Sequence, residues 1–404
     1  MKIALFTEVY RPIINGVVTS VDSLAEQLRV LGHEVFMFAP HIPNGVESAG
    51  RVFRMPSLPL PTRTEYRLTL PLVARRNKIR FLSQCDIIHS HSLFITGWMA
   101  SYYARRRFRI PFVYTYHTLL DSYAHYSPLG QHLTSQLTRE LTRTYANAAD
   151  AVIVPTKMVA AELRKQGVTA PLSVVPTGID IDAFRPDPEA RRSVRRLLEI
   201  APDAPVLLLV SRLAQEKNVP LALEALSRLH ERLPKAVLVL VGSGPLMGVL
   251  KEQVKASGLE DAVRFAGVVP HQMIASFYAA ADVFVFPSLT ETQGLVLAEA
   301  FAAGLPAVAL DSPQTREVFG THLAGEIVAD AGAMADAAFE LITVPVRRAL
   351  AKAHAKTAAA AFDSRVTAAK MLAIYEAVVS NAARSSGQSE SAEPLHESRM
   401  ETVI

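Results

Sequence analysis

Short apolar runs alternate with helical patterns along most of the chain. Val17, Val21, Leu24, Leu28 and Leu31 are spaced three or four residues apart, which predicts an amphipathic helix that ends at a glycine. Compact apolar runs on either side of it predict strands. In the first half of the chain, the predicted strands are 2–6, 34–39, 51–55, 86–90, 112–116, 151–154 and 172–175.

A second series of the same kind begins after Pro186. Its predicted strands are 206–210, 236–241, 263–266, 282–286, 307–310 and 326–328, and its predicted helices lie near 219–232, 246–257, 271–280 and 294–303. Strands that alternate with helices form parallel sheets joined by crossover helices. The pattern therefore predicts an α/β fold with two Rossmann-like domains.

Proline and glycine break regular structure near residues 176–190, and the joint between the two domains is expected there. We expect a first domain over residues 1–180 and a second over 181–362. Residues 363–382 are predicted to form one more amphipathic helix. The tail 383–404 is rich in serine and glutamate and poor in aromatic residues, so we expect it to be disordered.

The segment 282–304 combines an apolar strand, a polar turn and a helix that opens at Gly294. Backbone N–H groups at a helix N-terminus are unpaired and carry positive partial charge, so they bind phosphate well. Glu291 and Glu299 flank this helix start with seven residues between them. Because a carboxylate accepts hydrogen bonds from sugar hydroxyls, the segment offers a phosphate site between two hydroxyl-binding groups, which suits a nucleotide-sugar.

Other turns at strand ends offer glycines or cations. Gly16 joins the first strand to the first helix and permits close approach of the backbone to an anionic ligand. Arg212 and Lys217 follow the first strand of the second domain, at the strand end where open α/β sheets bind ligands. Gly242 and Gly244 permit a close approach after the next strand, although a plain tight turn explains them equally well.

Cysteine and histidine give little support for a metal site. The single cysteine, Cys85, excludes an internal disulfide and cysteine-cluster metal sites, and it is typical of a cytosolic protein. His89 and His91 look like a metal pair, but no obvious third ligand clusters with them, so zinc is not expected. His117 follows a predicted strand and is a candidate for the reacting centre.

Positive charge is concentrated in the first half of the chain. The net charge is +4, but residues 1–180 hold 20 Lys/Arg against 12 Asp/Glu, whereas 181–404 hold 22 against 26. The segment 51–109 holds twelve basic and two acidic residues and includes a proline-rich apolar stretch at 56–61. This combination favours contact with an anionic membrane, and a solvated face is the alternative. The central candidates are Arg75, Arg76, Lys78 and Arg80. No apolar run approaches the ~20 residues of a spanning helix.

Eight segments occur in the order seen in one large enzyme family: NGVVTS, DIIHSHS, YTYHTL, PTGID, SRLAQEKN, GSGP, AGVVP and TETQGLVLAEA. They resemble the motifs of retaining family 4 glycosyltransferases, which have the GT-B architecture of two Rossmann-like domains facing a central cleft. The resemblance covers about residues 1–380. The text around YRPIINGVVTS and SLTETQGLVLAEA looks most like bacterial diacylglycerol glucosyltransferases.

The resemblance implies a role for each candidate. The first domain would bind the acceptor, the second domain the nucleotide-sugar, and the C-terminal helix would cross back to the first domain. Arg212 and Lys217 would stabilise the departing diphosphate, and His117 would contact the 6-hydroxyl of the donor sugar. Glu291 would bind a sugar hydroxyl and Glu299 the ribose. The remaining donor-binding residues would be Gly16, Gly242, Gly244, Val268, Gly294, Leu295 and Val296.

The implied reaction moves glucose from UDP-glucose to a lipid such as 1,2-diacylglycerol, with retention at the anomeric carbon. No cofactor or divalent cation is expected to be essential, because protein cations and a helix dipole neutralise the diphosphate. We expect a nucleotide-sugar donor, a lipid acceptor and an anionic membrane surface as partners, no nucleic acid, and a cytoplasmic protein at the inner face of the cell membrane. The alternatives are a GDP-mannose-dependent mannosyltransferase acting on phosphatidylinositol or a polysaccharide precursor, and a nucleotide-sugar-binding module without turnover.

Overall fold

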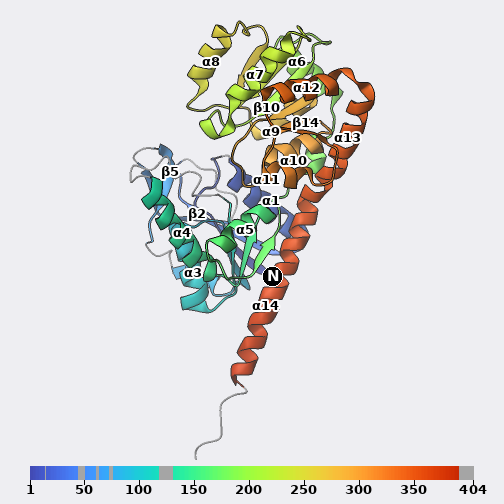
Figure 1. Cartoon of the computed structure of the whole chain (residues 1–404). Coiled ribbons are helices and arrows are strands. Elements are labelled where there is room, and N and C mark those ends of the chain that lie inside the picture. Colours follow the sequence, from blue (N-terminus) through green and yellow to red (C-terminus); the bar gives the residue numbers. More distant parts are fainter. Residues whose placement is uncertain (14, 44–50, 61–62, 72–75, 118–130, 391–404) are drawn as a thin grey trace, which may run out of the picture.

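The computed structural model describes residues 1–13, 15–43, 51–60, 63–71, 76–117 and 131–390. These residues form two α/β domains, one above the other, and a long C-terminal helix that starts at the second domain and runs along the first (Figure 1). The predicted α/β fold with two parallel sheets is confirmed.

The first domain is built on a seven-stranded parallel sheet with the order β3-β2-β1-β6-β7-β8-β9. Its strands are β1 (Lys2–Phe6), β2 (Glu34–Pro40), β3 (Val52–Met55), β6 (Ile87–Ser90), β7 (Phe112–Thr115), β8 (Ala151–Val154) and β9 (Leu172–Val174). Both faces of the sheet are buried: Ala4 and Phe6 pack into one core, and Ile3 and Leu5 into the other. This double burial explains why the strands read as uninterrupted apolar runs.

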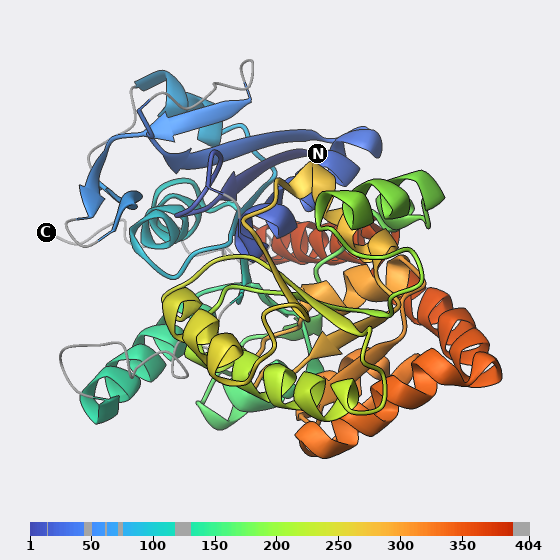
Figure 2. The same cartoon turned by 90° about the horizontal axis from the view of Figure 1, so that it is seen from above.

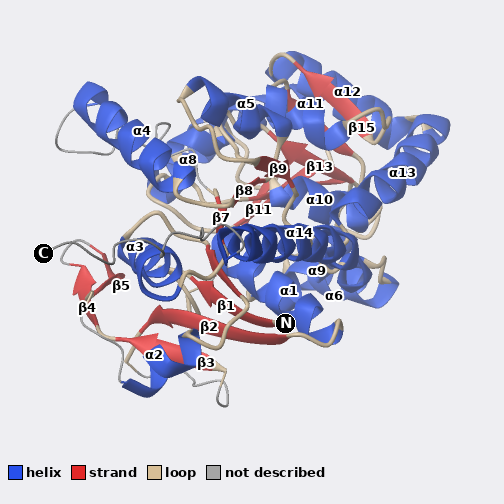
Figure 3. Cartoon of the chain, turned by 90° about the horizontal axis from the view of Figure 1, so that it is seen from below, coloured by secondary structure: helices blue, strands red, loops and turns tan. Residues whose placement is uncertain are grey.

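Helices cover both faces of this sheet. They are α1 (Gly16–Val30), α2 (Arg76–Leu82), α3 (Ile95–Ser101) with a π-helical continuation (Tyr102–Phe108), α4 (Gln131–Asn147) and α5 (Lys157–Lys165). The Asn15 side chain accepts a hydrogen bond from the Val18 N–H at 3.0 Å and so caps the start of α1. Helix α4 projects from the body of the domain (Figures 2 and 3).

One element of the first domain was not predicted. Strands β4 (Ser57–Leu60) and β5 (Arg63–Thr69) form an antiparallel hairpin in which Pro59 pairs with Arg67. The prolines of this stretch indicated a stiff loop. A two-stranded ribbon has only edge strands, where proline is tolerated because its missing N–H costs no ladder bond.

The second domain holds a six-stranded parallel sheet with the order β12-β11-β10-β13-β14-β15. Its strands are β10 (Val206–Val210), β11 (Val237–Val241), β12 (Val263–Gly267), β13 (Val283–Phe286), β14 (Ala307–Leu310) and β15 (Gly325–Val328). Its helices are α6 (Pro188–Leu197), α7 (Val219–His230), α8 (Met247–Ala256), α9 (His271–Ala280), α10 (Leu295–Ala302), α11 (Pro313–Phe319), α12 (Ala331–Thr343) and α13 (Pro345–Ala359).

Helix α14 (Ser364–Glu390) leaves the second domain and packs against α1 of the first (Figure 1). Its buried Tyr375 side chain reaches the first-domain core, where the hydroxyl lies 2.6 Å from His89 Nδ1. The helix ends at Glu390 rather than at residue 382, since an established helix gains one backbone hydrogen bond for each residue it adds. The rest of the predicted disordered tail lies outside the described residues. Every helix in the described part of the chain is too short or too polar to cross a bilayer.

Candidate functional site

The Gly16 turn of the first domain faces the start of α10 in the second. A Cβ atom built on Gly16 would lie 3.7 Å from Cδ1 of Leu295, so the two predicted diphosphate-binding segments meet across the domain boundary. Gly294 is the N-cap of α10 with φ of 76°, a left-handed conformation that glycine adopts without strain. Among the described residues no side chain caps α10, and the Leu297 N–H donates to the Gly294 carbonyl at 2.9 Å, which leaves the N–H groups of Leu295 and Val296 available to an anion.

Glu299 is a buried carboxylate on α10. The Tyr278 hydroxyl donates a hydrogen bond to its Oε2 at 2.7 Å. Burial raises the pKa of Glu299 to about 7, and the Tyr278 hydrogen bond opposes this rise. Glu299 lines a cavity of about 470 Å³ between α1, α9 and the linker that joins the domains. A carboxylate that titrates near neutral pH therefore faces a cavity large enough for a small molecule.

The two predicted catalytic cations each hold a carboxylate. Lys217 Nζ forms an ion pair with Glu291, and both side chains are less than one-fifth exposed. Arg212 Nη2 lies 2.8 Å from Oε1 of the buried Glu216. Neither pair was predicted from the sequence. The first joins two residues that are 74 positions apart in the chain. A diphosphate would compete with these carboxylates for the cations.

The predicted nucleotide-binding glycines have a packing role in this structure. A Cβ on Gly242 would clash with the carbonyl oxygen of Ser211, and one on Gly244 with that of Leu213. The loop that carries Arg212 therefore packs directly on these glycines, and their contact with a nucleotide stays a prediction. Val268 lies on the loop after β12 and is largely exposed.

Three histidines cluster at the carboxyl ends of β6 and β7. His117 Nε2 lies 2.9 Å from His91 Nδ1, and His89 is held by the Tyr375 hydroxyl and by Thr115 Oγ1 at 2.7 Å. Burial lowers the pKa of His117 to about 4 and that of His89 to about 3, with the His117 charge lowering the latter further. The rings are therefore neutral at pH 7. No group of three or more His, Cys, Asp or Glu side chains suited to a metal ion occurs among the residues that the structure describes.

Hydrogen bonds tie the loop before α10 to the first domain. The buried Gln293 side chain accepts from the Thr177 N–H at 2.7 Å and donates to the Thr177 carbonyl at 3.1 Å. Glu317 of α11 accepts from the backbone N–H groups of Lys157 and Met158 at 2.5 and 3.2 Å, so it caps α5 from the opposite domain. No local pattern in the sequence marks Gln293 or Glu317 for these roles.

Glu8 was also missed by sequence reasoning. It lies just after β1, and its Oε2 accepts hydrogen bonds from the Thr96 N–H at 2.9 Å and from Thr96 Oγ1 at 2.6 Å. Glu8 thus caps α3, whose N-cap residue Phe94 provides no side-chain cap. Its position directly after an apolar strand was the signal available in the sequence.

The predicted membrane-contacting cations are only partly described. Arg75 lies outside the described residues, and Arg76 and Lys78 belong to α2, but their side chains are not described. Arg80, in the last turn of α2, is exposed.

Comparisons with known proteins match both halves of the chain. Residues 14–183 match the family described as Glycosyltransferase Family 4, and residues 191–357 match Glycosyl transferases group 1. The chain is 32% identical over 351 residues to the alpha-monoglucosyldiacylglycerol synthase of Streptococcus pneumoniae, covering 85% of this chain and 79% of that protein. It is 30% identical over 335 residues to a GDP-mannose-dependent alpha-mannosyltransferase of Mycobacterium tuberculosis, covering 80% and 83%.

Solved structures have the same fold. The Anabaena protein HepE in complex with UDP and glucose superposes with a TM-score of 0.75 at 20% identity, covering 93% of this chain and all of that one. Sucrose-phosphate synthase from Thermosynechococcus elongatus gives a TM-score of 0.74 at 25% identity, covering 94% and 99%. The two family matches, the relatives and the two parallel sheets lead to one conclusion: this chain belongs to the family 4 glycosyltransferases of GT-B fold and is a hexosyltransferase.

Proposed function

We propose that the protein transfers glucose from UDP-glucose to a membrane lipid such as 1,2-diacylglycerol, with retention at the anomeric carbon. The observation that carries this proposal is the 32% identity to alpha-monoglucosyldiacylglycerol synthases of Streptococcus pneumoniae and Acholeplasma laidlawii, which extends over 79% and 80% of those proteins. The meeting of the Gly16 turn with the uncapped start of α10 supports a diphosphate-bearing donor.

In this proposal, the donor lies across the domain boundary. The N–H groups at the start of α10 and the Gly16 turn bind the diphosphate, with Leu295 and Val296 in the first turn of the helix. Glu299 binds the ribose hydroxyls and Glu291 a sugar hydroxyl. The neutral His117 exchanges a hydrogen bond with the 6-hydroxyl of the sugar, and the ring is held in place by its contact with His91. Backbone groups near Val268 contact the base.

The chemical step proposed is attack on the face from which the diphosphate departs. The ion pair with Lys217 engages Glu291, so we assign this carboxylate no role as a covalent nucleophile. The acceptor hydroxyl oxygen bonds to the anomeric carbon as the bond to the diphosphate oxygen breaks, and the hydroxyl proton passes to that oxygen. Arg212, Lys217 and the helix dipole of α10 stabilise the charge on the departing UDP, so the proposal requires no cofactor or metal ion.

A donor panel tests the proposal. Purified protein is incubated with dioleoylglycerol in mixed micelles and with UDP-glucose, UDP-galactose, GDP-glucose or GDP-mannose, and lipid products are separated by chromatography. We expect at least tenfold higher kcat/KM with UDP-glucose, and proton NMR of the product should show an α-linkage. A preference for GDP-mannose would instead favour the activity named for the mycobacterial relative. Binding of UDP without turnover of any donor would leave a non-catalytic module.

An exposed apolar face of the first domain supports a membrane acceptor. The hairpin β4–β5, α3 and α4 lie on the side of this domain away from α14 (Figures 1 and 3). Helix α3 contacts β5, and Trp98 of α3 packs against Tyr145 of α4 with ring centroids 5.3 Å apart. The large exposed apolar side chains on these elements or directly next to them are Leu58, Leu68, Phe94, Trp98, Tyr102, Leu137 and Leu141. Aromatic and leucine side chains beside exposed arginines are typical of a surface that lies in a bilayer interface.

We predict that binding to phosphatidylglycerol vesicles falls as salt rises and exceeds binding to phosphatidylcholine, because each cation near an anionic surface contributes about 1 kcal/mol. Replacing Arg75, Arg76, Lys78 and Arg80 together by Glu should abolish this binding. The double variant Leu137→Ser with Leu141→Ser should weaken vesicle binding at every salt concentration. These leucines are proposed to insert into the apolar part of the bilayer, and salt does not screen that contribution. Vesicle sedimentation measures each effect.

The control is Leu197→Ser, which removes an even more exposed leucine from α6 of the second domain and should leave sedimentation unchanged. Hydrolysis of UDP-glucose in detergent should be similar in all these proteins. If the wild type sediments equally with anionic and neutral vesicles, the basic stretch is a solvated face.

A further inference from the structure

A second cavity, of about 730 Å³, lies in the second domain away from the site described above. Its lining includes Asp282, which precedes β13, and Leu305, which precedes β14. It therefore opens at the amino edge of the sheet. The loop that carries Glu291 follows β13 and lies at the carboxyl edge, where parallel sheets bind their substrates. The cavity is consequently distinct from the donor site.

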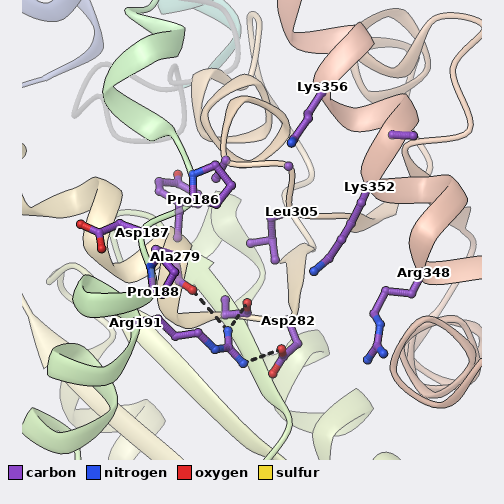
Figure 4. Close-up of a pocket in the computed structure, with 15 residues that line it drawn as sticks. Pro186, Asp187, Pro188, Arg191, Ala279, Asp282, Leu305, Arg348, Lys352 and Lys356 are labelled. Carbon is purple, nitrogen blue, oxygen red and sulfur yellow. Dashed lines mark hydrogen bonds and ion pairs between the residues drawn. The ribbon is translucent and has the colours of Figure 1, made fainter. Parts of the chain in front are cut away.

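One wall of the cavity is formed by cations of α13. Arg348, Lys352 and Lys356 are spaced four residues apart, which places them on one face of the helix. Figure 4 shows Lys352 and Lys356 extending from α13 toward Leu305. Within the described residues, no carboxylate forms an ion pair with any of the three, and their only hydrogen bond runs from Arg348 to the Ile342 carbonyl at 3.2 Å.

The carboxylates of the cavity are already engaged by other groups. Asp282 lies 2.8 Å from both Arg191 and Arg195, and Arg191 also donates to the carbonyl groups at the end of α9 (Figure 4). Asp187 caps α6 by accepting from the N–H groups of its first turn. Arg191 and Arg195 are therefore already bound, both to Asp282 and the former also to the end of α9. Among the described residues, these contacts leave the three α13 cations without a carboxylate at ion-pair distance.

The cations around this cavity repel one another. Partial removal from water lowers the pKa of Lys352, and the charges of Arg348, Arg191 and Lys356 lower it further, against the attraction of Asp282. Helix α10 ends beside this cavity, and the Lys356 side chain packs against Gly304, which follows the helix. A helix C-terminus attracts a cation, but its partial charge is about half of one elementary charge and cannot balance three.

We propose that this cavity binds a dissolved, multiply charged phosphate compound. Its phosphate groups would contact Lys352, Lys356 and Arg348, and its body would lie against the apolar side chains of Pro186 and Leu305. The cavity volume is in the range of small-molecule sites. A dissolved compound fits better than a lipid headgroup, because α13 lies on the opposite side of the molecule from β5, α3 and α4 (Figure 1).

A ligand in this cavity could influence the donor site through the side chain of Tyr278. Tyr278 contributes to the cavity lining, and its hydroxyl is the group that donates to Glu299. A ligand there would lie against the residue that orients the proposed ribose-binding carboxylate.

Calorimetry with inorganic tripolyphosphate tests the proposal on the full chain. The protein is first saturated with UDP, so that the diphosphate site at α10 is occupied. We expect one tripolyphosphate to bind per chain, and the double variant Lys352→Ala with Lys356→Ala to bind at least tenfold more weakly. Both lysines are exposed, so folding should be preserved, which circular dichroism checks. The matched control, Lys370→Ala, removes an exposed lysine of α14 and should bind like the wild type.

Several results would overturn the proposal. One is an absence of tripolyphosphate binding to the UDP-saturated protein, and another is equal affinity in the wild type and the double variant. An equal loss in Lys370→Ala would mean non-specific attraction. In a separate arm, the double variant should sediment with phosphatidylglycerol vesicles as the wild type does. A selective loss of vesicle binding would identify a lipid headgroup as the ligand and contradict the proposal of a dissolved compound.

Discussion

Arg212→Ala and Lys217→Ala are each expected to lower kcat by roughly 10²-fold or more while the fold is preserved. Both cations are proposed to stabilise the charge that develops on the departing diphosphate, and loss of one such group costs about 3–4 kcal/mol of barrier. Single-turnover rates with UDP-glucose measure the effect, and circular dichroism checks the fold. Near-wild-type turnover of either variant would remove diphosphate stabilisation from the role of that residue.

The ion pairs in the structure complicate the interpretation of these variants and suggest a control. Lys217→Ala leaves the largely buried Glu291 without its partner, and an unpaired carboxylate would itself repel a diphosphate. The double variant Lys217→Ala with Glu291→Gln removes both charges. If the cation acts on the diphosphate, kcat of the double variant stays well below that of Glu291→Gln alone. Recovery of kcat would mean that Lys217 serves only to neutralise Glu291.

A second control uses a cation of the same domain. Arg228 lies on α7 and forms an exposed ion pair with Glu224. Exposed pairs contribute little to stability. Arg228→Ala should therefore change neither kcat nor the fold, and a comparable loss of kcat there would indicate that general charge, rather than position, governs turnover.

The strands could be predicted because of where they are buried. Ile3 and Leu5 face one core and Ala4 and Phe6 the other, so residues 3–6 of β1 are all apolar and the run stands out from its neighbours. The hairpin β4–β5 has no such signal, since its prolines and arginines interrupt the apolar pattern. Patterning therefore locates strands that are buried on both faces and misses exposed ribbons.

The candidate site could be located from sequence, but its internal contacts could not. The start of α10 and the Gly16 turn were identifiable because glycine and strand-end position are local features. The pairing of Lys217 with Glu291 joins two side chains that are distant in the chain and meet only in the folded second domain. The bonds between Gln293 and Thr177 form only where the two domains meet. The buried position of Glu299 against Tyr278 likewise requires packed helices, and its raised pKa follows from that packing.

That raised pKa leads to a prediction about donor binding. In the role proposed for Glu299, its ionised carboxylate accepts hydrogen bonds from both ribose hydroxyls, whereas the protonated form loses part of that capacity. Because the pKa is about 7, affinity for UDP-glucose should increase as pH rises from 6 to 8, by up to tenfold per unit below the pKa. UDP-glucose is the appropriate ligand for this calorimetry, because its diphosphate has no proton to lose near neutrality.

Substitutions at and near Glu299 sharpen the test. Glu299→Gln should weaken binding of both UDP and UDP-glucose, since the ribose is common to both, and should remove the pH dependence. Tyr278→Phe keeps the carboxylate but deletes the hydrogen bond that holds its pKa down, so the transition should move to higher pH. Glu291→Ala, by contrast, should spare UDP and weaken only the sugar nucleotide. Equal losses of UDP affinity in the two glutamate variants would exchange or remove their assigned roles.

The same carboxyl group should make the stability of the folded protein fall as pH rises, whereas affinity for UDP-glucose should increase. A carboxyl group whose pKa is raised by folding stabilises the folded state below its ordinary pKa of 4.5, and this contribution is lost as pH rises through about 7. Glu299→Gln should therefore raise Tm at pH 8, where it removes a buried charge, and leave Tm nearly unchanged at pH 5. Thermal unfolding at the two pH values measures this. If Glu299 binds the ligand and its buried charge destabilises the fold, Glu299→Gln should be more stable at pH 8 and bind UDP more weakly. An unchanged Tm at pH 8 together with undiminished UDP affinity would contradict both assignments.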